Sequence, residues 1–345
     1  MKTAQLQATE KRMLKVLHIG VANRGTWPLE RCDASTGLVP HALCDVSDDA
    51  LAAARERTGL PASACFKDVD AAMRDGGADV VIACVPTVLH VPIAKKALAA
   101  GLPILIEKGM APDWASAQDL AETTRRLGGK VAVAQNYRYF GIERTIWHAV
   151  NDPDFPYYLG PVHLVQYNQN RVRPQVRTLS YPFASVWDMS CHHFDNLLAW
   201  LGPMREMTAH SWRATWSPYE HDNNTTAHVR FENGTNCQYL HTHDAARSTL
   251  EVQLHGERGA LVRNEDTLTF NERPLEQFGT RDLVKVATVP ARGESDLLRD
   301  FHAYVVDGSE PGVSVFNNLE TMAACELMVR SITQKRTVAR SELDA

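Results

Sequence analysis

Short hydrophobic runs alternate with helix-like stretches along the first 135 residues. Leu14–Ile19 and Leu38–Cys44 are apolar runs rich in strand-forming residues. Residues 48–58 read as a helix, with Ser47 as its N-cap and Gly59 as its stop. The alternation continues with strands at 79–85, 102–106 and 130–134, and helices at 92–100 and 114–127. This spacing predicts a parallel, doubly wound α/β sheet.

In such sheets, ligands bind beyond the carboxyl ends of the strands. This rule alone selects a small set of positions, before any motif is considered: Gly20, Asp45, Pro86, Glu107 and Gln135.

A turn resembling a dinucleotide fingerprint follows the first strand. Residues 20–25 read Gly-Val-Ala-Asn-Arg-Gly, with Ala22 in place of the middle glycine. By itself, such a turn fits a purely structural role equally well. Asp45 lies 20 residues beyond Gly25, where a carboxylate can accept hydrogen bonds from the adenosine ribose and would repel a 2′-phosphate. No arginine occurs at 46–50, so the sequence favours NAD over NADP, although a capping role for Asp45 is the alternative.

Composition narrows the class of protein further. The 345 residues suggest about two domains, and a net charge of −5 without a basic tract argues against a nucleic-acid partner. No run approaches the roughly 18 apolar residues of a membrane span. The seven scattered cysteines read as buried free thiols of a cytoplasmic protein. Residues 1–12 lack the apolar core of a signal peptide, and we expect residues 1–13 to be a flexible tail.

Four motifs become specific when they are taken together. They lie at residues 80–90 (VVIACVPTVLH), 106–109 (IEKG), 136–139 (NYRY) and 188–195 (DMSCHHFD). This combination resembles the Gfo/Idh/MocA family, the relatives of glucose-fructose oxidoreductase and inositol dehydrogenase. The resemblance extends from about residue 14 to the closing segments at 297–306, 312–314 and 318–332.

The resemblance implies a Rossmann domain at 14–136, followed by an α/β domain at 137–345 that binds substrate. The second domain would contain a large, open, mostly antiparallel sheet, and its exposed face would form a dimer or tetramer. Strand-like runs match that expectation at 162–169, 207–212, 225–231, 236–243, 248–255 and 259–263.

The cofactor contacts expected from these motifs and strand ends form one set. It comprises Gly20, Ala22, Asn23, Arg24, Gly25, Asp45, Val85, Pro86, Thr87, His90, Glu107, Lys108 and Asn136.

Oxidising a secondary alcohol requires a hydride acceptor, a base for the hydroxyl proton and a group that holds the oxygen. Residues 187–200 read as a helix, which places Asp188, His192 and Asp195 on one face. By resemblance, Lys108 contacts the reacting hydroxyl, His192 is the acid/base and Asp188 positions the substrate, while Asp195 could orient the imidazole. The alternatives are a solvated lysine and a packed core histidine.

The chain departs from the family pattern at two positions. Gly109 replaces the usual proline after Lys108, and Thr87 stands where asparagine or proline is common. A cis bond costs about 0.5–1 kcal/mol before proline but about 2.5–4 kcal/mol elsewhere. The Lys108–Gly109 bond is therefore either trans or held cis by its surroundings.

Several further residues are candidates for substrate contact. Arg138 follows the last Rossmann strand, and Asp195 and Arg173 are included with Lys108, Asp188 and His192. Arg173 lies with Arg171 and Arg177 in a loop that could form a lid, bind an acidic substituent or be solvated. His241 and His243 share one strand face, but two ligands do not make a metal site, and we expect none.

Together these features predict an NAD-dependent oxidoreductase for a small polyhydroxylated substrate. It would oxidise a secondary hydroxyl of a sugar, a sugar derivative or a cyclitol, or reduce the matching ketone. Two alternatives stay open: a redox-neutral enzyme that cleaves glycosides by transient oxidation and elimination, and a non-catalytic regulator that senses the dinucleotide.

Overall fold

The computed structural model describes residues 12–173, 181–272 and 283–344, so Arg177 and most of the expected tail lie outside the described residues. The chain divides into two compact units. The first consists of the described parts of Met1–Glu107, Glu122–Ala134 and Glu294–Val315, and the second of those of Lys108–Ala121, Gln135–Gly293 and Phe316–Ala345. Each unit takes chain from both sides of residue 136, and the domain division drawn there stays a prediction.

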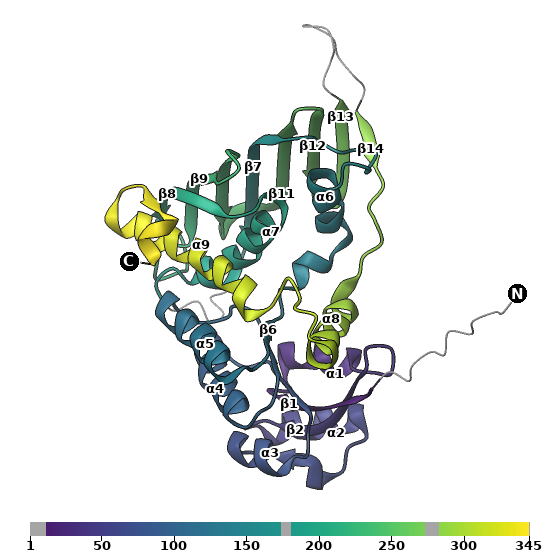
Figure 1. Ribbon diagram of the computed structural model, residues 1–345. Coiled ribbons are helices and arrows are strands. Elements are labelled where there is room, and N and C mark those ends of the chain that lie inside the picture. Colours follow the sequence, from purple (N-terminus) through teal and green to yellow (C-terminus); the bar gives the residue numbers. More distant parts are fainter. Residues whose placement is uncertain (1–11, 174–180, 273–282, 345) are drawn as a thin grey trace, which may run out of the picture. The chain divides into compact units, whose positions relative to one another are not determined.

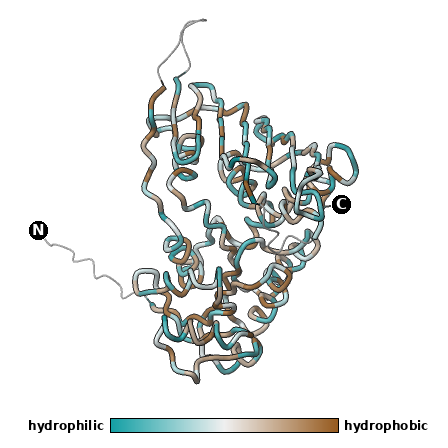
Figure 2. The backbone as a smooth tube through the Cα atoms, turned by 180° about the vertical axis from the view of Figure 1, so that it is seen from behind, coloured by the Kyte–Doolittle hydropathy of each residue, from teal (hydrophilic) through white to brown (hydrophobic). Residues whose placement is uncertain are grey.

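The first unit contains a six-stranded parallel sheet, as the strand–helix alternation predicted (Figure 1). Its strand order is β3-β2-β1-β4-β5-β6, in which the order reverses beside β1. The strands are β1 (Leu14–Ile19), β2 (Leu38–Cys44), β3 (Cys65–Phe66), β4 (Val80–Ala83), β5 (Ile104–Ile106) and β6 (Val131–Val133). Every residue of β4, β5 and β6 is buried, as expected for strands covered on both faces. Figure 2 colours the backbone by hydropathy and shows brown, hydrophobic stretches in this unit.

Local signals in the sequence set the bounds of α2 (Asp48–Thr58). The Ser47 side chain accepts a hydrogen bond from the amide of Ala50, and Gly59 ends the helix in the left-handed region at φ 71°. The other helices that contribute to this unit are α1 (Thr26–Arg31), α3 (Val69–Asp75), α4 (His90–Ala99) and α8 (Gly293–Asp307), while α5 (Trp114–Leu127) is divided between the units.

The second unit contains a nine-stranded sheet in which only β7 and β10 pair in parallel, which confirms the mostly antiparallel expectation. Its order is β14-β13-β12-β11-β7-β10-β9-β8-β15. The strands are β7 (Val162–Val172), β8 (Met204–Trp212), β9 (Asn224–Phe231), β10 (Asn236–Thr242), β11 (Asp244–Gly256), β12 (Gly259–Asn264), β13 (Thr267–Glu272), β14 (Val284–Val286) and β15 (Val338–Ala339).

Three helices cover one face of this sheet (Figure 1). They are α6 (Gly141–Asn151), α7 (Cys191–Leu201) and α9 (Val315–Gln334). Phe194 of α7 packs its ring against Tyr239 of β10, with centroids 5.2 Å apart. Arg263 of β12 forms a buried ion pair of 2.6 Å with Glu143 of α6. None of the described helices is both long and apolar enough to cross a membrane.

The expected helix at 187–200 is only partly correct. Val186–Ser190 forms a π-helical turn, and the α-helix begins at Cys191. Asp188 therefore lies in the wider turn, whereas His192 and Asp195 lie in the α-helix itself.

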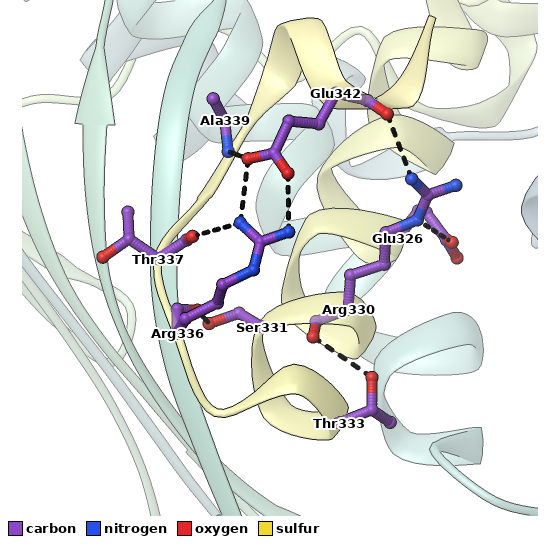
Figure 3. Close-up of polar contacts among 8 residues, drawn as sticks. All are labelled: Glu326, Arg330, Ser331, Thr333, Arg336, Thr337, Ala339 and Glu342. Atoms are coloured by element: carbon purple, nitrogen blue, oxygen red, sulfur yellow. Dashed lines mark hydrogen bonds and ion pairs between the residues drawn. The ribbon is translucent and has the colours of Figure 1, made fainter. Parts of the chain in front are cut away.

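The end of the chain is fastened to α9 by a network around Glu342 (Figure 3). The Glu342 carboxylate receives two hydrogen bonds from the Arg336 guanidinium, of 3.0 and 2.6 Å, and one of 2.8 Å from the amide of Ala339. The carbonyl of Glu342 accepts a further bond from Arg330 of α9. This network holds β15, the edge strand of the sheet, beside β8.

We expect the network to make stability depend on pH in the acid range. The hydrogen bond from Arg336, followed by that from Ala339, lowers the pKa of Glu342 to about 2 from its ordinary 4.5. A carboxyl with a depressed pKa stabilises the fold above its unfolded pKa and loses that contribution as pH falls toward the folded one. The difference in melting temperature between wild type and Glu342→Gln should therefore be largest above pH 5 and shrink toward pH 3.

Glu232→Gln removes an acid in a turn outside this network and serves as the control. A melting difference for Glu342→Gln that is the same at pH 6 and pH 3 would contradict the assignment.

Candidate active site

The turn at residues 20–25 requires glycine at both ends. Gly20 has φ +77°, and a Cβ there would lie 2.2 Å from the carbonyl oxygen of Cys84. A Cβ on Gly25 would lie 1.9 Å from the carbonyl oxygen of Gly20. Both contacts are far shorter than any real packing distance, whereas Ala22 has an extended backbone at φ −100° that admits a side chain. The turn is therefore compatible with Ala22 but not with side chains at its ends.

Gly25→Ala is expected to destabilise the protein by more than about 1 kcal/mol, because the new methyl group meets backbone that cannot move aside. As this is the expected dinucleotide turn, NAD binding should weaken as well. Thermal unfolding and calorimetric titration with NAD measure the two effects.

Ala22→Gly is the matched control, since it restores the usual middle glycine of the motif and adds no atoms. Wild-type stability and NAD affinity in Gly25→Ala would contradict the steric argument.

A cavity of about 280 Å³ opens beside this turn in the first unit. Six residues of the expected cofactor set line it: Gly20, Ala22, Asn23, Asp45, Val85 and Pro86. The remaining lining includes the aliphatic side chains of Val46, Val69, Leu89 and Ile93. A lining that combines aliphatic side chains with a carboxylate suits a nucleoside, which presents a flat base and a polar sugar.

Two backbone amides fix the Asp45 carboxylate at the wall of this cavity. Its Oδ2 accepts from the amide of Val21 and its Oδ1 from the amide of Ser47, each at 2.9 Å. Lys67 also lines the cavity, which the sequence reasoning missed. Its position just after the short strand β3 was the available signal, because that is another carboxyl end of the same sheet.

Glu107 at the end of β5 is the centre of a second group in this unit. Its Oε1 accepts hydrogen bonds from Arg24 Nε at 3.2 Å, Arg24 Nη2 at 2.8 Å and Trp27 Nε1 at 2.9 Å. The structure thus brings Arg24 and Glu107 together, and adds Trp27, which the sequence reasoning did not select. His90 is buried, with its Nε2 2.8 Å from the carbonyl oxygen of Val85. Thr87 begins the short 3₁₀ turn before α4.

In the second unit, the Lys108–Gly109 peptide bond is cis, which answers the question left open by the missing proline. A Cβ on Gly109 would lie 2.9 Å from the carbonyl oxygen of Trp187. The Lys108 ammonium donates a 2.7 Å hydrogen bond to the backbone carbonyl of Asp188. Lys108 is thereby attached to the π-helical turn that leads into α7.

The imidazole of His192 stacks on the ring of Tyr137, with centroids 4.1 Å apart and planes 6° from parallel. His192 is only 4% exposed. Tyr137 belongs to the 3₁₀ turn Asn136–Tyr139, so this turn sets the ring orientation of His192. Asn136 also lies in the second unit.

Arg138 and Asp195, two expected substrate contacts, are paired with each other. Arg138 Nε and Nη2 reach the two carboxylate oxygens of Asp195 at 2.6 and 2.9 Å, and Thr321 donates to the same carboxylate at 3.0 Å. Burial alone would lower the pKa of Arg138, but the Asp195 carboxylate outweighs it and raises that pKa. Both oxygens of Asp195 are therefore occupied by groups other than the His192 ring.

The last expected substrate residue, Arg173, follows β7. Its backbone is held from two sides: its amide donates to the carbonyl of His243 at 3.2 Å, and its carbonyl accepts from the Tyr219 hydroxyl at 2.8 Å. No three histidine, cysteine or acidic side chains are arranged to hold a metal ion within the described ranges.

Comparison with known proteins agrees with this architecture. Residues 14–135 match the model of an oxidoreductase family with an NAD-binding Rossmann fold, and residues 158–339 match the model of that family's C-terminal α/β domain. The protein y4oX of Sinorhizobium fredii is 25% identical over 92% of this chain and 93% of its own length. Inositol 2-dehydrogenase of an Arthrobacter species is 34% identical, but over only 34% of either chain.

Solved structures share the fold over nearly the whole chain. An oxidoreductase from Agrobacterium radiobacter in complex with NAD⁺, L-tartaric acid and magnesium has a TM-score of 0.81 at 17% identity, covering 97% of this chain and 100% of its own. The aldose-aldose oxidoreductase of Caulobacter crescentus has a TM-score of 0.81 at 18% identity, covering 95% of this chain and 100% of its own.

Proposed function

The chain belongs to the Gfo/Idh/MocA family of oxidoreductases, and from that membership we propose that it is an NAD-dependent dehydrogenase of polyhydroxylated substrates. It oxidises a secondary hydroxyl of a sugar, a sugar derivative or a cyclitol, or reduces the matching ketone. The observation that carries this proposal is the attachment of Lys108 to the turn that leads into the helix of His192.

Lys108 and His192 have different roles toward the substrate hydroxyl group. The Lys108 ammonium holds the substrate oxygen by a hydrogen bond and stabilises negative charge that develops on it. The His192 imidazole accepts the hydroxyl proton during oxidation and returns it during reduction. Stacking on Tyr137 fixes the plane of the imidazole ring.

The residues around the turn at 20–25 fit a dinucleotide. The absence of side chains at Gly20 and Gly25 admits a close backbone approach of the pyrophosphate, and Asp45 can accept hydrogen bonds from the adenosine ribose. The same carboxylate disfavours the 2′-phosphate of NADP. When bound, the nicotinamide supplies the hydride acceptor.

The substrate class also has support from relatives. The Arthrobacter relative is named an inositol 2-dehydrogenase, and the Caulobacter structure is an aldose-aldose oxidoreductase. Cyclitols and aldoses both present several secondary hydroxyls on a small ring.

The proposal includes a homo-oligomer formed through the face of the nine-stranded sheet that α6, α7 and α9 do not cover. That face carries a hollow of about 580 Å³ whose lining includes Asn168, Thr208, His210, His228 and Gln238. A second copy of the chain would bury these polar side chains against their own equivalents. Light scattering coupled to gel filtration tests this, and a monomer at all concentrations would exclude it.

NADH absorbance across a panel of inositols, aldoses, 3-keto-sugars and uronic acids tests the activity. We expect NAD⁺-dependent NADH formation with at least one polyol, or NADH consumption with its ketone. Product without net NADH would instead indicate a redox-neutral enzyme. NAD binding without turnover of any compound would indicate a regulator.

A further inference from the structure

A polar patch interrupts the apolar inner face of the nine-stranded sheet at the end of β7. Along β7 the inward side chains Val165, Tyr167 and Gln169 are buried, and the same alternation continues to Arg171 and Arg173. On the parallel neighbour β10, Tyr239 pairs with Tyr167 and His241 with Gln169. The paired residues end at Thr242 and Asn170, and the same register extended by one residue on each strand sets His243 beside Arg171. Two arginines and two histidines therefore share one corner of the sheet.

This patch contacts the π-helical turn Val186–Ser190, which precedes the helix of His192. Arg171 Nη1 is 3.4 Å from the sulfur of Met189, and the Ser190 hydroxyl is 3.3 Å from His241 Nδ1. Met189 and Ser190 are the residues between Asp188 and the start of α7. A group bound at the patch therefore lies beside the turn whose Asp188 carbonyl accepts the hydrogen bond from Lys108.

Buried polar atoms in the patch have no protein partner among the described residues. They are Nε2 of His241, both ring nitrogens of His243 and the hydroxyl of Thr225. Thr225 belongs to β9 and is the strand partner of His241. His241 and His243 are 0% and 2% exposed. Burial, followed by the charge of nearby arginines, lowers the pKa of His243 to about 4. Burial also lowers the pKa of His241, so both rings are neutral at pH 7 and each carries one N–H.

The patch also carries a net positive charge, because the single carboxylate of Asp244 offsets only one of the two arginines. Neither Arg171 nor Arg173 forms an ion pair with any described residue, although both are only half exposed. The neighbouring acid, Asp244, is occupied by Asn224, Asn223 and Ser217, at 2.9, 3.1 and 2.9 Å. Partly buried guanidinium groups are stabilised best by a planar oxyanion, which they bind through two parallel hydrogen bonds.

We propose that Arg171, Arg173, His241 and His243 form a subsite for an anionic substituent of the substrate, a carboxylate or a phosphate. The arginines supply the counter-charge and the neutral histidines supply N–H donors. This inference rests on the proposed function, and it narrows the substrate from any polyol to an acidic one, such as a uronate, an aldonate or a sugar phosphate.

Binding tests the subsite without turnover. Calorimetric titration of the NADH-loaded protein with galacturonate, galactose and galactose 6-phosphate, and with the corresponding glucose set, compares each acid with its neutral counterpart. We expect at least one acid to bind 10-fold or more tighter than its counterpart. The class of acid that binds more tightly, the uronate or the sugar phosphate, identifies the anionic group that the subsite recognises. Equal affinities, or no binding of any acid, would overturn the subsite.

Variants assign the effect to these residues. Arg171→Gln and Arg173→Ala should each weaken binding of the preferred acid 10- to 100-fold and change that of its neutral counterpart less than 2-fold. Arg247→Ala, which removes an exposed arginine of β11, should change neither. Equal losses for acid and neutral ligand would indicate a structural role instead and refute the proposal.

Kinetics separates this inference from the proposed function. NADH formation from neutral polyols with kcat/KM equal to that of the acids would leave the dehydrogenase in place but eliminate the anionic subsite. Tight binding of an acid without any NADH formation would support the anionic subsite but contradict the proposed dehydrogenase activity.

Discussion

Replacing His192 by alanine is expected to lower kcat by about 10²- to 10⁴-fold, the usual contribution of a general acid/base. The imidazole, stacked on Tyr137, is the proposed acceptor of the hydroxyl proton. Affinity for NAD should stay within 2-fold of wild type, because the proposed cofactor turn lies at residues 20–25. Steady-state rates with saturating NAD⁺ and calorimetric titration with NAD measure the two quantities.

His192→Asn keeps a planar polar group against Tyr137 and separates packing from chemistry. It should retain the wild-type melting temperature and still lose the activity. His221→Ala, in the loop between β8 and β9, is the matched control and should behave as wild type. A rate near that of wild type in His192→Ala would remove His192 from the mechanism.

Lys108→Met is expected to lower kcat/KM by about 10²- to 10³-fold, as the removal of one preorganised donor to a developing oxyanion typically does. Methionine keeps most of the aliphatic length and removes only the charged donor. The loss should appear in kcat as well as in KM, because the hydrogen bond strengthens as negative charge develops on the oxygen.

Because the Lys108 ammonium also binds the carbonyl of Asp188, its loss could loosen the π-helical turn. Thermal unfolding distinguishes that effect from lost chemistry: the activity should fall far more than the melting temperature. Lys285→Met, on the exposed strand β14, is the control. An unchanged kcat in Lys108→Met would show that the amine does not act on the reacting oxygen.

The sequence was most informative where the local structure depends on residues that are close together in the chain. The bounds of α2 follow from Ser47 and Gly59, which act within one turn of the helix. β1 and β2 were predicted with their observed ends, because each is a mainly apolar run that is followed at once by glycine or a polar residue. The parallel order of the first sheet then follows from the alternation of strands and helices.

Contacts between distant parts of the chain could not be predicted in the same way. The bond from Lys108 to the Asp188 carbonyl joins residues 80 positions apart, and no local pattern in 186–190 marks a π-helical turn. The pairing of Arg138 with Asp195 spans 57 positions, so each appeared to be available for substrate. β14 and β15 are too short to give a period-2 signal, with three and two residues.

The return of the chain to its first sheet has a consequence for how the protein is made. The outer edge of β6 is bonded by residues near the C-terminus: the Val133 amide donates to the carbonyl of Val313 at 2.8 Å, and Ala132 bridges to Ser314. During synthesis this edge stays open until about 180 further residues have emerged, and open strand edges recruit other chains. A fragment truncated after residue 136 should therefore self-associate, whereas supplying residues 294–315 as a peptide in trans should suppress its aggregation.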